Sequence, residues 1–171
     1  PPAPGGPVTA AGLDVYERRV DALLQQGSEP MVTLFHWDLP AALDDLGGWL
    51  NPDIAGWFAD YASVLFRRLD GRVKLWATLN EPWVVSDGGY LAGVLAPGHS
   101  NLFEAPIVEH NLQRSHGMAV GRFRLSKAGK KGKIGTVVNL EPKHPASDSP
   151  EYPSAVRQAG VARTSAYADP V

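Results

Sequence analysis

The sequence predicts an α/β fold in which parallel strands alternate with helices, as in a piece of a (β/α)8 TIM barrel. Apolar patterns alternate along the chain in the order helix, strand, helix, strand, helix, strand, which is the order found in parallel α/β proteins. The run over residues 31–37 is nearly apolar on both sides, as in parallel strands that are covered by helices. The chain has 171 residues, whereas a closed barrel takes about 250, and three parallel strands alone leave two apolar edges unpaired. These observations predict a single incomplete barrel segment over residues 1–171.

The first helix is expected between Thr9 and Gly27. Residues 1–8 are rich in Pro and Gly, so they are expected to form a loop. Thr9 is a suitable N-cap, and Gly27 is a suitable C-terminal breaker. The apolar residues between them recur at helical spacing: Leu13, Tyr16, Val20, Leu23 and Leu24. The first strand follows over residues 31–37.

The second helix has the clearest start signals. Asn51 is a suitable N-cap, Pro52 takes the first helical position, and Asp53 lies near the positive end of the helix dipole. The residues expected to be buried on this helix are Ile54, Trp57, Phe58, Tyr61, Leu65 and Leu69. Gly71 ends the helix, and the second strand begins at Val73.

The second strand carries the leading catalytic candidate. Apolar residues alternate along residues 73–79, which is a strand pattern. Pro82 cannot donate to a sheet ladder, so the strand is expected to stop there and to leave Asn80 and Glu81 at its carboxyl end. Ligands and catalytic groups collect at this end of parallel strands. Glu81 is therefore the first choice for a catalytic residue.

The second half of the chain predicts one more helix and one more strand. Residues 83–101 contain Gly and aromatic residues without a regular pattern, and are expected to form a long functional loop. A helix over residues 104–126 can hold Pro106 only in its first turn. The residues expected to face inward on this helix are Ile107, Leu112, Met118, Ala119 and Phe123. A third strand is expected over residues 134–140, followed by a short helix over residues 151–163.

The composition argues against several classes of partner. Lys and Arg number 16 and Asp and Glu number 18, for a formal charge of -2, so neither nucleic acid nor an anionic membrane is expected to bind. No apolar run approaches the roughly 20 residues of a membrane span, and no signal segment is visible, which favours a cytoplasmic protein. Cysteine is absent and no His, Asp and Glu set has metal-ligand spacing, so no metal or cofactor is expected. The oligomeric state stays open.

Three segments at the ends of the predicted strands share a family pattern. They are Thr-Leu-Phe-His-Trp-Asp-Leu-Pro at residues 33–40, Thr-Leu-Asn-Glu-Pro at residues 78–82 and Asn-Leu-Glu-Pro at residues 139–142. Together they resemble glycoside hydrolase family 1, the β-glucosidases and their relatives. Asn-Glu-Pro alone occurs in other retaining barrel glycosidases, but its combination with the upstream His-Trp-Asp-Leu-Pro is specific.

The resemblance implies a (β/α)8 barrel to which this chain supplies about the third, fourth and fifth strands. It also implies a small-molecule β-glycoside as substrate. Glu81 matches the family's acid/base glutamate, and Asn80 matches the residue that holds the sugar 2-hydroxyl. His36 matches a residue that binds another hydroxyl of the same sugar, and Trp37 would wall that subsite. Asn139 matches an asparagine at the end of the fifth strand, toward the leaving group.

The family's nucleophile has no counterpart in this chain. Retaining hydrolysis needs a second carboxyl group about 5–5.5 Å from the acid/base. The family glutamate lies in a Thr-Glu-Asn-Gly segment that the sequence lacks. The chain is therefore expected to carry the acid/base half of a β-glucosidase-type site for terminal β-D-glycosides and to be inactive alone. A 6-phospho-β-glycosidase and a non-catalytic carbohydrate-binding remnant are the alternatives.

Several of these residues also allow a purely structural interpretation. Without the resemblance, His36 is better explained as a core histidine bonded to a carbonyl. Three aromatic residues could stack on a sugar ring or simply pack in the barrel: Trp37, Trp83 and Tyr90. Three polar residues of the third helix are expected to be structural: His110, Asn111 and His116. Glu141 is expected to be a loop residue, although it also precedes a proline.

Overall fold

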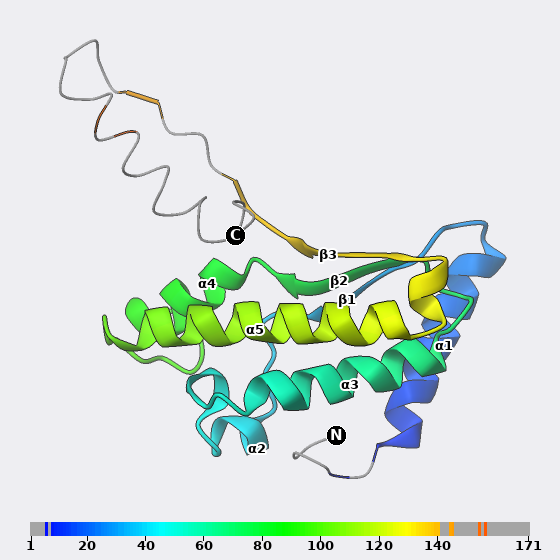
Figure 1. The fold of residues 1–171 in the computed structure, drawn as a ribbon, viewed down its shortest axis with the longest axis horizontal. Helices are drawn as coiled ribbons and strands as arrows, with labels where there is room; N and C mark the ends of the chain where they lie inside the picture. Colours follow the sequence, from blue (N-terminus) through cyan, green and yellow to red (C-terminus); the bar gives the residue numbers. More distant parts are fainter. Residues whose placement is uncertain (1–5, 7, 141–143, 146–153, 155, 157–171) are drawn as a thin grey trace. The chain divides into compact units, whose positions relative to one another are not determined.

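A computed structural model describes residues 6, 8–140, 144, 145, 154 and 156 of the chain. The chain divides into two compact units, residues 1–137 and residues 138–171. The first unit contains the sheet and the helices discussed below (Figure 1). Glu141 lies outside the described residues, and so does most of the helix expected over residues 151–163.

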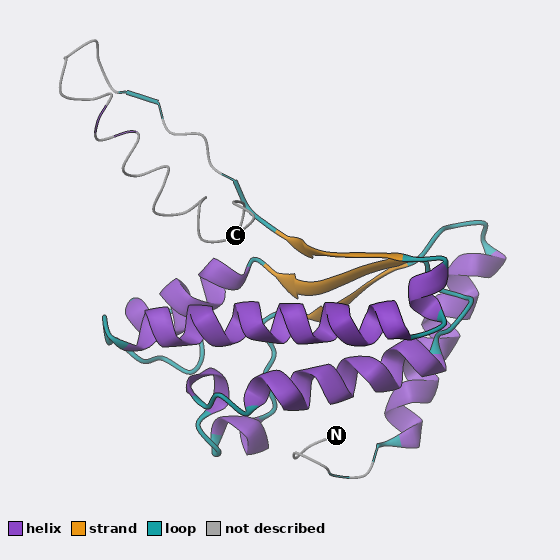
Figure 2. Ribbon diagram, viewed as in Figure 1, coloured by secondary structure: helices purple, strands orange, loops and turns teal. Residues whose placement is uncertain are grey.

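The first unit is built on a parallel sheet of three strands in the order β1-β2-β3 (Figure 2). The strands are β1 (Met31–Phe35), β2 (Leu75–Asn80) and β3 (Lys133–Val137). Both pairs are parallel, so the predicted α/β class is confirmed. All three strands are shorter than the apolar runs that predicted them.

Three long helices alternate with these strands, as the sequence predicts. They are α1 (Ala10–Gln25), α3 (Ile54–Arg68) and α5 (Glu104–Leu125). Helices α3 and α5 lie side by side and cover one face of the sheet (Figure 1). The loop after β1 also contains two short helical turns that the sequence pattern does not predict: α2 (Ala41–Asp44) and η1 (Gly48–Leu50).

Three aromatic side chains join the sheet to its two covering helices. Trp76 of β2 contacts Phe66 of α3 edge-on, with ring centroids 4.9 Å apart, and Phe123 of α5 lies 5.2 Å from Phe66 and 6.4 Å from Trp76. All three are at least 98% buried. The indole N–H of Trp76 donates to the carbonyl oxygen of Val73 at 3.2 Å, so this residue is buried without an unmet donor.

The start of the second predicted helix is close to the expected one. The side-chain oxygen of Asn51 accepts a hydrogen bond from the backbone N–H of Asp53 at 2.9 Å, as a capping residue does. Trp57 and Tyr61, two of the residues expected to be buried, remain partly exposed. Thr9, the other expected cap, makes no capping hydrogen bond with its side chain.

Ion pairs connect helix α1 to the last turn of α3 and to the residues just after it. Arg68 lies 3.1 Å from Asp14 and 2.6 Å from Glu17, and Arg72 bonds Glu17 and Asp21. The hydrogen bond from Arg72 is the largest cause of a lowered pKa at Glu17. Of the apolar residues expected on the inner side of this helix, only Val20 is fully buried. Because exposed ion pairs stabilise little, we expect these pairs to add little to the attachment of α1.

Residues 82–91 correct the expected irregular loop. They form α4 (Pro82–Ser86) and a π-helical turn η2 (Asp87–Leu91). Pro82 begins α4, the position at which proline costs a helix nothing because that N–H would be unpaired anyway. Tyr90 is 1% exposed and meets His99 edge-on, and burial raises its pKa to about 12. The packing interpretation of Tyr90 is therefore the correct one.

The inward face expected for the third helix was partly wrong. Ile107 and Met118 are 49% and 41% exposed. The buried stripe of α5 instead includes two polar residues, Asn111 and Ser115, between its apolar members. Asn111 donates to the carbonyl oxygen of Trp49 at 2.9 Å and Ser115 to that of Asn111 at 2.7 Å, so both can be buried without a large penalty.

Candidate active site

Two predicted site residues meet at the carboxyl ends of β1 and β2. The indole N–H of Trp37, just after β1, donates to the backbone oxygen of Asn80 at 2.9 Å. His36 and Trp37 are both exposed, and their ring centroids lie 5.3 Å apart. Asn80 and Glu81 are half-buried. Trp37 is thus fixed to the strand that presents Glu81.

Trp37 and Glu81 also share an unusual backbone conformation. Among the described residues they are the two non-glycine positions with positive φ, at 75° and 44°. Such conformations cost about 1–3 kcal/mol each and gather at functional sites. Because both residues lie at the ends of neighbouring strands, this edge of the sheet is a candidate functional site.

The turn at Glu81 has a clear physical cause. Its backbone N–H donates to the carbonyl oxygen of Val137 in β3 at 2.8 Å, and its carbonyl oxygen accepts from Val84 in α4 at 2.9 Å. One residue therefore has to join a strand ladder to the first turn of a helix. The left-handed conformation at Glu81, with φ 44° and ψ 64°, makes this sharp change of direction and sets where the side chain points.

An irregularity in the sheet directly precedes this turn. Ala77 pairs with Gly135, but the next pair is Asn80 with Val137. Two residues of β2, Thr78 and Leu79, therefore lie opposite one residue of β3. This is the count of a β-bulge, a feature that is common beside active sites because it redirects side chains.

The carboxylate of Glu81 is not committed to a structural partner. Within residues 8–140, no hydrogen bond or ion pair involves this carboxylate. The half-buried side chain of Glu81 is therefore available to contact a bound molecule. Asn139 is exposed and belongs to the second unit, so its role in the site stays a prediction.

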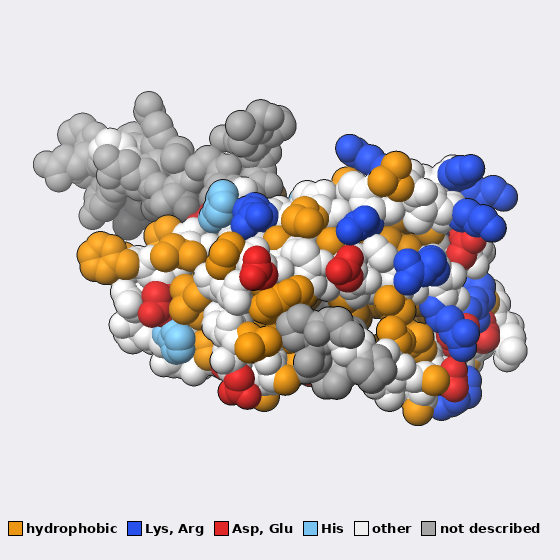
Figure 3. All heavy atoms as spheres, turned by 60° about the horizontal axis from the view of Figure 1, so that its bottom comes forward, with side chains coloured by type: hydrophobic (Ala, Val, Ile, Leu, Met, Phe, Trp, Pro, Cys, Tyr) orange, Lys and Arg blue, Asp and Glu red, His pale blue; other side chains and the backbone are white. Residues whose placement is uncertain are grey.

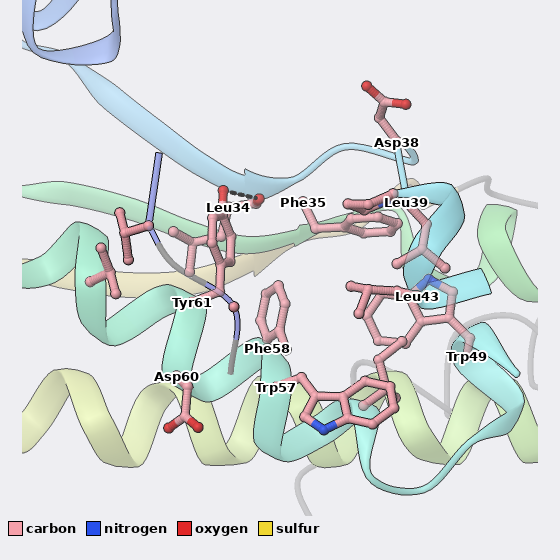
Figure 4. Close-up of a pocket in the computed structure, with 15 residues that line it drawn as sticks. Leu34, Phe35, Asp38, Leu39, Leu43, Trp49, Trp57, Phe58, Asp60 and Tyr61 are labelled. Carbon is pink, nitrogen blue, oxygen red and sulfur yellow. Dashed lines mark hydrogen bonds between the residues drawn. The ribbon is translucent and has the colours of Figure 1, made fainter. Parts of the chain in front are cut away.

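The structure also contains an apolar cavity that is separate from these residues. It measures about 320 Å³ and lies between the end of β1, the following loop and α3 (Figure 4). Leu34, Phe35, Leu39 and Phe58 are among its walls, and the side chains of Asp38 and Asp60 point away from it (Figure 4). None of His36, Trp37, Asn80 or Glu81 lines it. Its lining is mainly apolar, although Asp38, Asp60 and Tyr61 also border it.

Behind β2 lies a buried chain of hydrogen bonds that sequence reasoning missed. The hydroxyl of Thr78 lies 2.7 Å from Nδ1 of His116 on α5 and donates to the carbonyl oxygen of Gly135 at 3.1 Å. Burial lowers the pKa of His116, so the neutral ring is favoured. The adjacent polar residues in the Thr-Leu-Asn-Glu-Pro and His-Gly segments were the available signal, but nothing in the sequence paired them.

We expect the stability of the chain to fall as the pH drops below about 6.5. The folded state holds His116 neutral, whereas the unfolded chain binds a proton near its ordinary pKa of 6.5. The unfolded state then binds more protons, so stability is full above pH 6.5 and is lost as the pH falls toward the lowered pKa. Urea midpoints between pH 7.5 and pH 5 measure this. The variant His116→Asn, which keeps a donor near Nδ1 but does not titrate, should fall less steeply; an equal slope would contradict the assignment.

Two other kinds of site were sought in the described part of the chain. No helix there combines the length and apolar character needed to cross a membrane. No group of three His, Asp or Glu side chains among those residues is arranged to hold a metal ion.

Comparison with known proteins agrees with the resemblance in the sequence. The model for glycosyl hydrolase family 1 matches residues 1–171. The chain is 51% identical over 152 residues to β-glucosidase A of Thermotoga maritima, covering 89% of this chain and 34% of that protein. It is 41% identical over 166 residues to β-glucosidase A of Acetivibrio thermocellus, covering 97% of this chain and 37% of the relative.

Solved structures give the same result. The family 1 β-glucosidase from Thermotoga maritima matches with a TM-score of 0.86 and 50% identity, over 90% of this chain and 34% of that one. The same enzyme in complex with glucoimidazole matches with a TM-score of 0.85 and 51% identity, over 89% and 34% of the two chains. The chain spans about a third of the length of these relatives, and its three-stranded parallel sheet is consistent with part of a barrel. The chain belongs to glycosyl hydrolase family 1.

Proposed function

We propose that this chain carries the acid/base half of a retaining β-glucosidase-type site that hydrolyses terminal β-D-glycosides, with Glu81 as the acid/base. The observation that carries the proposal is the position of Glu81. This residue lies at the carboxyl end of β2, in the Asn-Glu-Pro segment, and its backbone is left-handed. The relatives that match the chain are named β-glucosidases. By the same resemblance, β1, β2 and β3 correspond to about the third, fourth and fifth strands of the barrel.

In this reaction Glu81 has two successive roles. Its carboxylic acid protonates the glycosidic oxygen while the nucleophilic carboxylate attacks the anomeric carbon, so that the leaving group departs as an alcohol. The resulting carboxylate then takes a proton from water as that water attacks the glycosyl-enzyme. The second step regenerates both carboxyl groups and retains the configuration of the sugar.

The neighbouring residues of the strand ends would hold the sugar. The side-chain amide of Asn80 would donate to the 2-hydroxyl, and His36 would bind another hydroxyl of the same ring. Because the indole N–H of Trp37 is already bonded to the backbone of Asn80, Trp37 would meet the sugar through its ring rather than through a hydrogen bond. Asn139 would act on the leaving-group side.

The purified chain alone is expected to show no hydrolysis of 4-nitrophenyl β-D-glucoside above the buffer background. Its sequence lacks the Thr-Glu-Asn-Gly segment that would supply the nucleophile, and a proton donor alone cannot carry out a double displacement. The matched positive control is a chimaera in which the aligning segment of the Thermotoga maritima β-glucosidase is replaced by the corresponding residues of this chain. We expect the chimaera to be active. If the chain alone hydrolysed the glucoside, and if Glu81→Gln abolished that activity, the conclusion that the nucleophile is missing would be wrong.

The 6-phospho-β-glycosidase alternative stays open, because the resemblance places its phosphate-binding residues in a late loop that has no counterpart in this sequence. Basic side chains gather at the end of the molecule where α3 and α5 finish, and both helices have two arginines in their last turn (Figure 3). That end lies away from the carboxyl ends of the strands. Assaying the chimaera with both the glucoside and its 6-phosphate separates these substrates. Binding of a glucoside by an inactive chimaera would instead favour a carbohydrate-binding remnant.

A further inference from the structure

The β-bulge before Glu81 is closed by two threonine hydroxyls. Thr78 of β2 donates to the carbonyl oxygen of Gly135 in β3 at 3.1 Å, and Thr136 of β3 donates to the carbonyl oxygen of Leu79 in β2 at 3.0 Å. The two bonds run in opposite directions between the same two strands. Together they span the stretch in which Thr78 and Leu79 lie opposite Thr136.

These hydroxyls add two hydrogen bonds between β2 and β3 where the register of the ladder is irregular. At a bulge the regular pairing of backbone groups is interrupted, and a buried carbonyl oxygen without a donor is costly. Thr78 is fully buried and Thr136 is half-buried. The threonine pair, Thr78 and Thr136, therefore supplies a donor to each of the two carbonyl oxygens and links the strands where the register shifts.

His116 fixes the direction in which one of these hydroxyls points. A threonine hydroxyl has one hydrogen, and that of Thr78 is used for Gly135. The Thr78 oxygen then accepts at 2.7 Å from Nδ1–H of His116, which requires the tautomer with a proton on Nδ1. The side chain of His116 on α5 thus orients the hydroxyl of Thr78 on β2.

We propose that Thr78, Thr136 and His116 are positioning residues that hold the bulge and so fix the turn at Glu81. After the bulge, the ladder resumes with Asn80 opposite Val137 and with the backbone N–H of Glu81 bonded to Val137. A change in the bulge would move this bond, and with it the carboxyl group. The importance of this positioning for catalysis rests on the acid/base role proposed for Glu81, but the positioning itself can be measured without any reaction.

The test is amide hydrogen exchange in the 171-residue chain, followed by NMR. In Thr78→Val, which keeps the shape but removes the donor, the Glu81 amide is expected to exchange about tenfold faster while the amides of α3 stay unchanged. Thr78→Ser should restore the protection. In the unsubstituted chain, the ¹⁵N shifts of His116 should report a protonated Nδ1, and in Thr78→Val part of the population should shift to Nε2–H.

Ser115→Ala is the matched control. Ser115 is as deeply buried as Thr78 and adjoins His116, but its hydroxyl donates within its own helix, so its removal should leave the Glu81 amide as it was. Three results would overturn the proposal. In the first, the exchange rate of the Glu81 amide is unchanged in Thr78→Val. In the second, exchange is accelerated equally at Glu81 and throughout α3. In the third, the Glu81 amide of the unsubstituted chain is not protected from exchange. The acid/base role would fail separately, through an active Glu81→Gln chimaera.

Discussion

Glu81→Gln is expected to lower kcat/KM of the chimaera for cellobiose about 10³-fold. The amide has nearly the same shape as the carboxyl group, so the turn at Glu81 and the sugar-binding neighbours are kept. It can neither protonate the departing oxygen nor accept a proton from the attacking water. The leaving group of cellobiose is a hydroxyl of glucose, whose departure depends strongly on protonation. The rate with cellobiose therefore reports the full loss. Initial rates over a range of cellobiose concentrations measure it.

The dependence on the leaving group identifies the lost role as that of an acid/base. Dinitrophenolate leaves without a proton, so Glu81→Gln should still form the glycosyl-enzyme from a dinitrophenyl β-D-glucoside, with a burst followed by slow turnover. Azide, which needs no general base, should accelerate that slow step and give a glucosyl azide. The matched control is Glu141→Gln, the other glutamate that precedes a proline, which should keep most of the activity. An equal loss on both classes of substrate would contradict the acid/base assignment.

The arrangement of the fold could be predicted from the sequence because each element has a strong local signal. Helix α3 begins with an Asn-Pro-Asp start that supplies a cap and a suitable proline. The apolar run of β2 ends at Pro82, and proline cannot continue a ladder. These signals depend on residues near one another in the chain. The parallel pairing followed from the alternation of helices and strands.

The predictions of burial on α5 were wrong where burial depends on residues that are far away in the sequence. Ile107 and Met118 are apolar but exposed, while Asn111 and Ser115 occupy the buried stripe of α5. The polar pair can be buried because specific carbonyl oxygens, including that of Trp49, accept from it. Hydrophobicity alone cannot identify such partners. Similarly, the sequence pattern predicts only that Pro82 ends a strand, whereas in the structure Pro82 also begins α4.

The position of the candidate residues at strand ends could be predicted, but their geometry could not. Asn80 and Glu81 were found from a short motif, and the motif did place them at a strand end. The positive φ of Trp37 and Glu81 and the bulge between Ala77 and Asn80 have no signature in a single sequence. They arise from contacts between strands and helices that are 40 or more residues apart, such as Trp37 with Asn80 and Thr78 with Gly135.

Trp76→Ala is expected to cost the chain about 3–5 kcal/mol of folding free energy. Trp76 is 2% exposed and touches both Phe66 of α3 and Phe123 of α5, so its removal leaves a cavity between the sheet and both covering helices. The sheet of the described residues has three strands and therefore two edges, so we expect the stability of the chain to be modest. Urea unfolding followed by circular dichroism measures the change, and a variant that is already unfolded sets a lower limit equal to the stability of the original chain.

Trp57→Ala separates this effect from the loss of any tryptophan. Trp57 has the same side chain, but it lies on α3 and is only half-buried, so part of its surface is already in contact with water. Its truncation removes fewer contacts and leaves a space that solvent can enter, which should cost much less than the cavity at Trp76. Equal losses for the two variants would mean that the aromatic contacts among Phe66, Trp76 and Phe123 do not dominate the core. The attachment of the sheet to α3 and α5, and hence the position of the strand that carries Glu81, would then depend on other contacts.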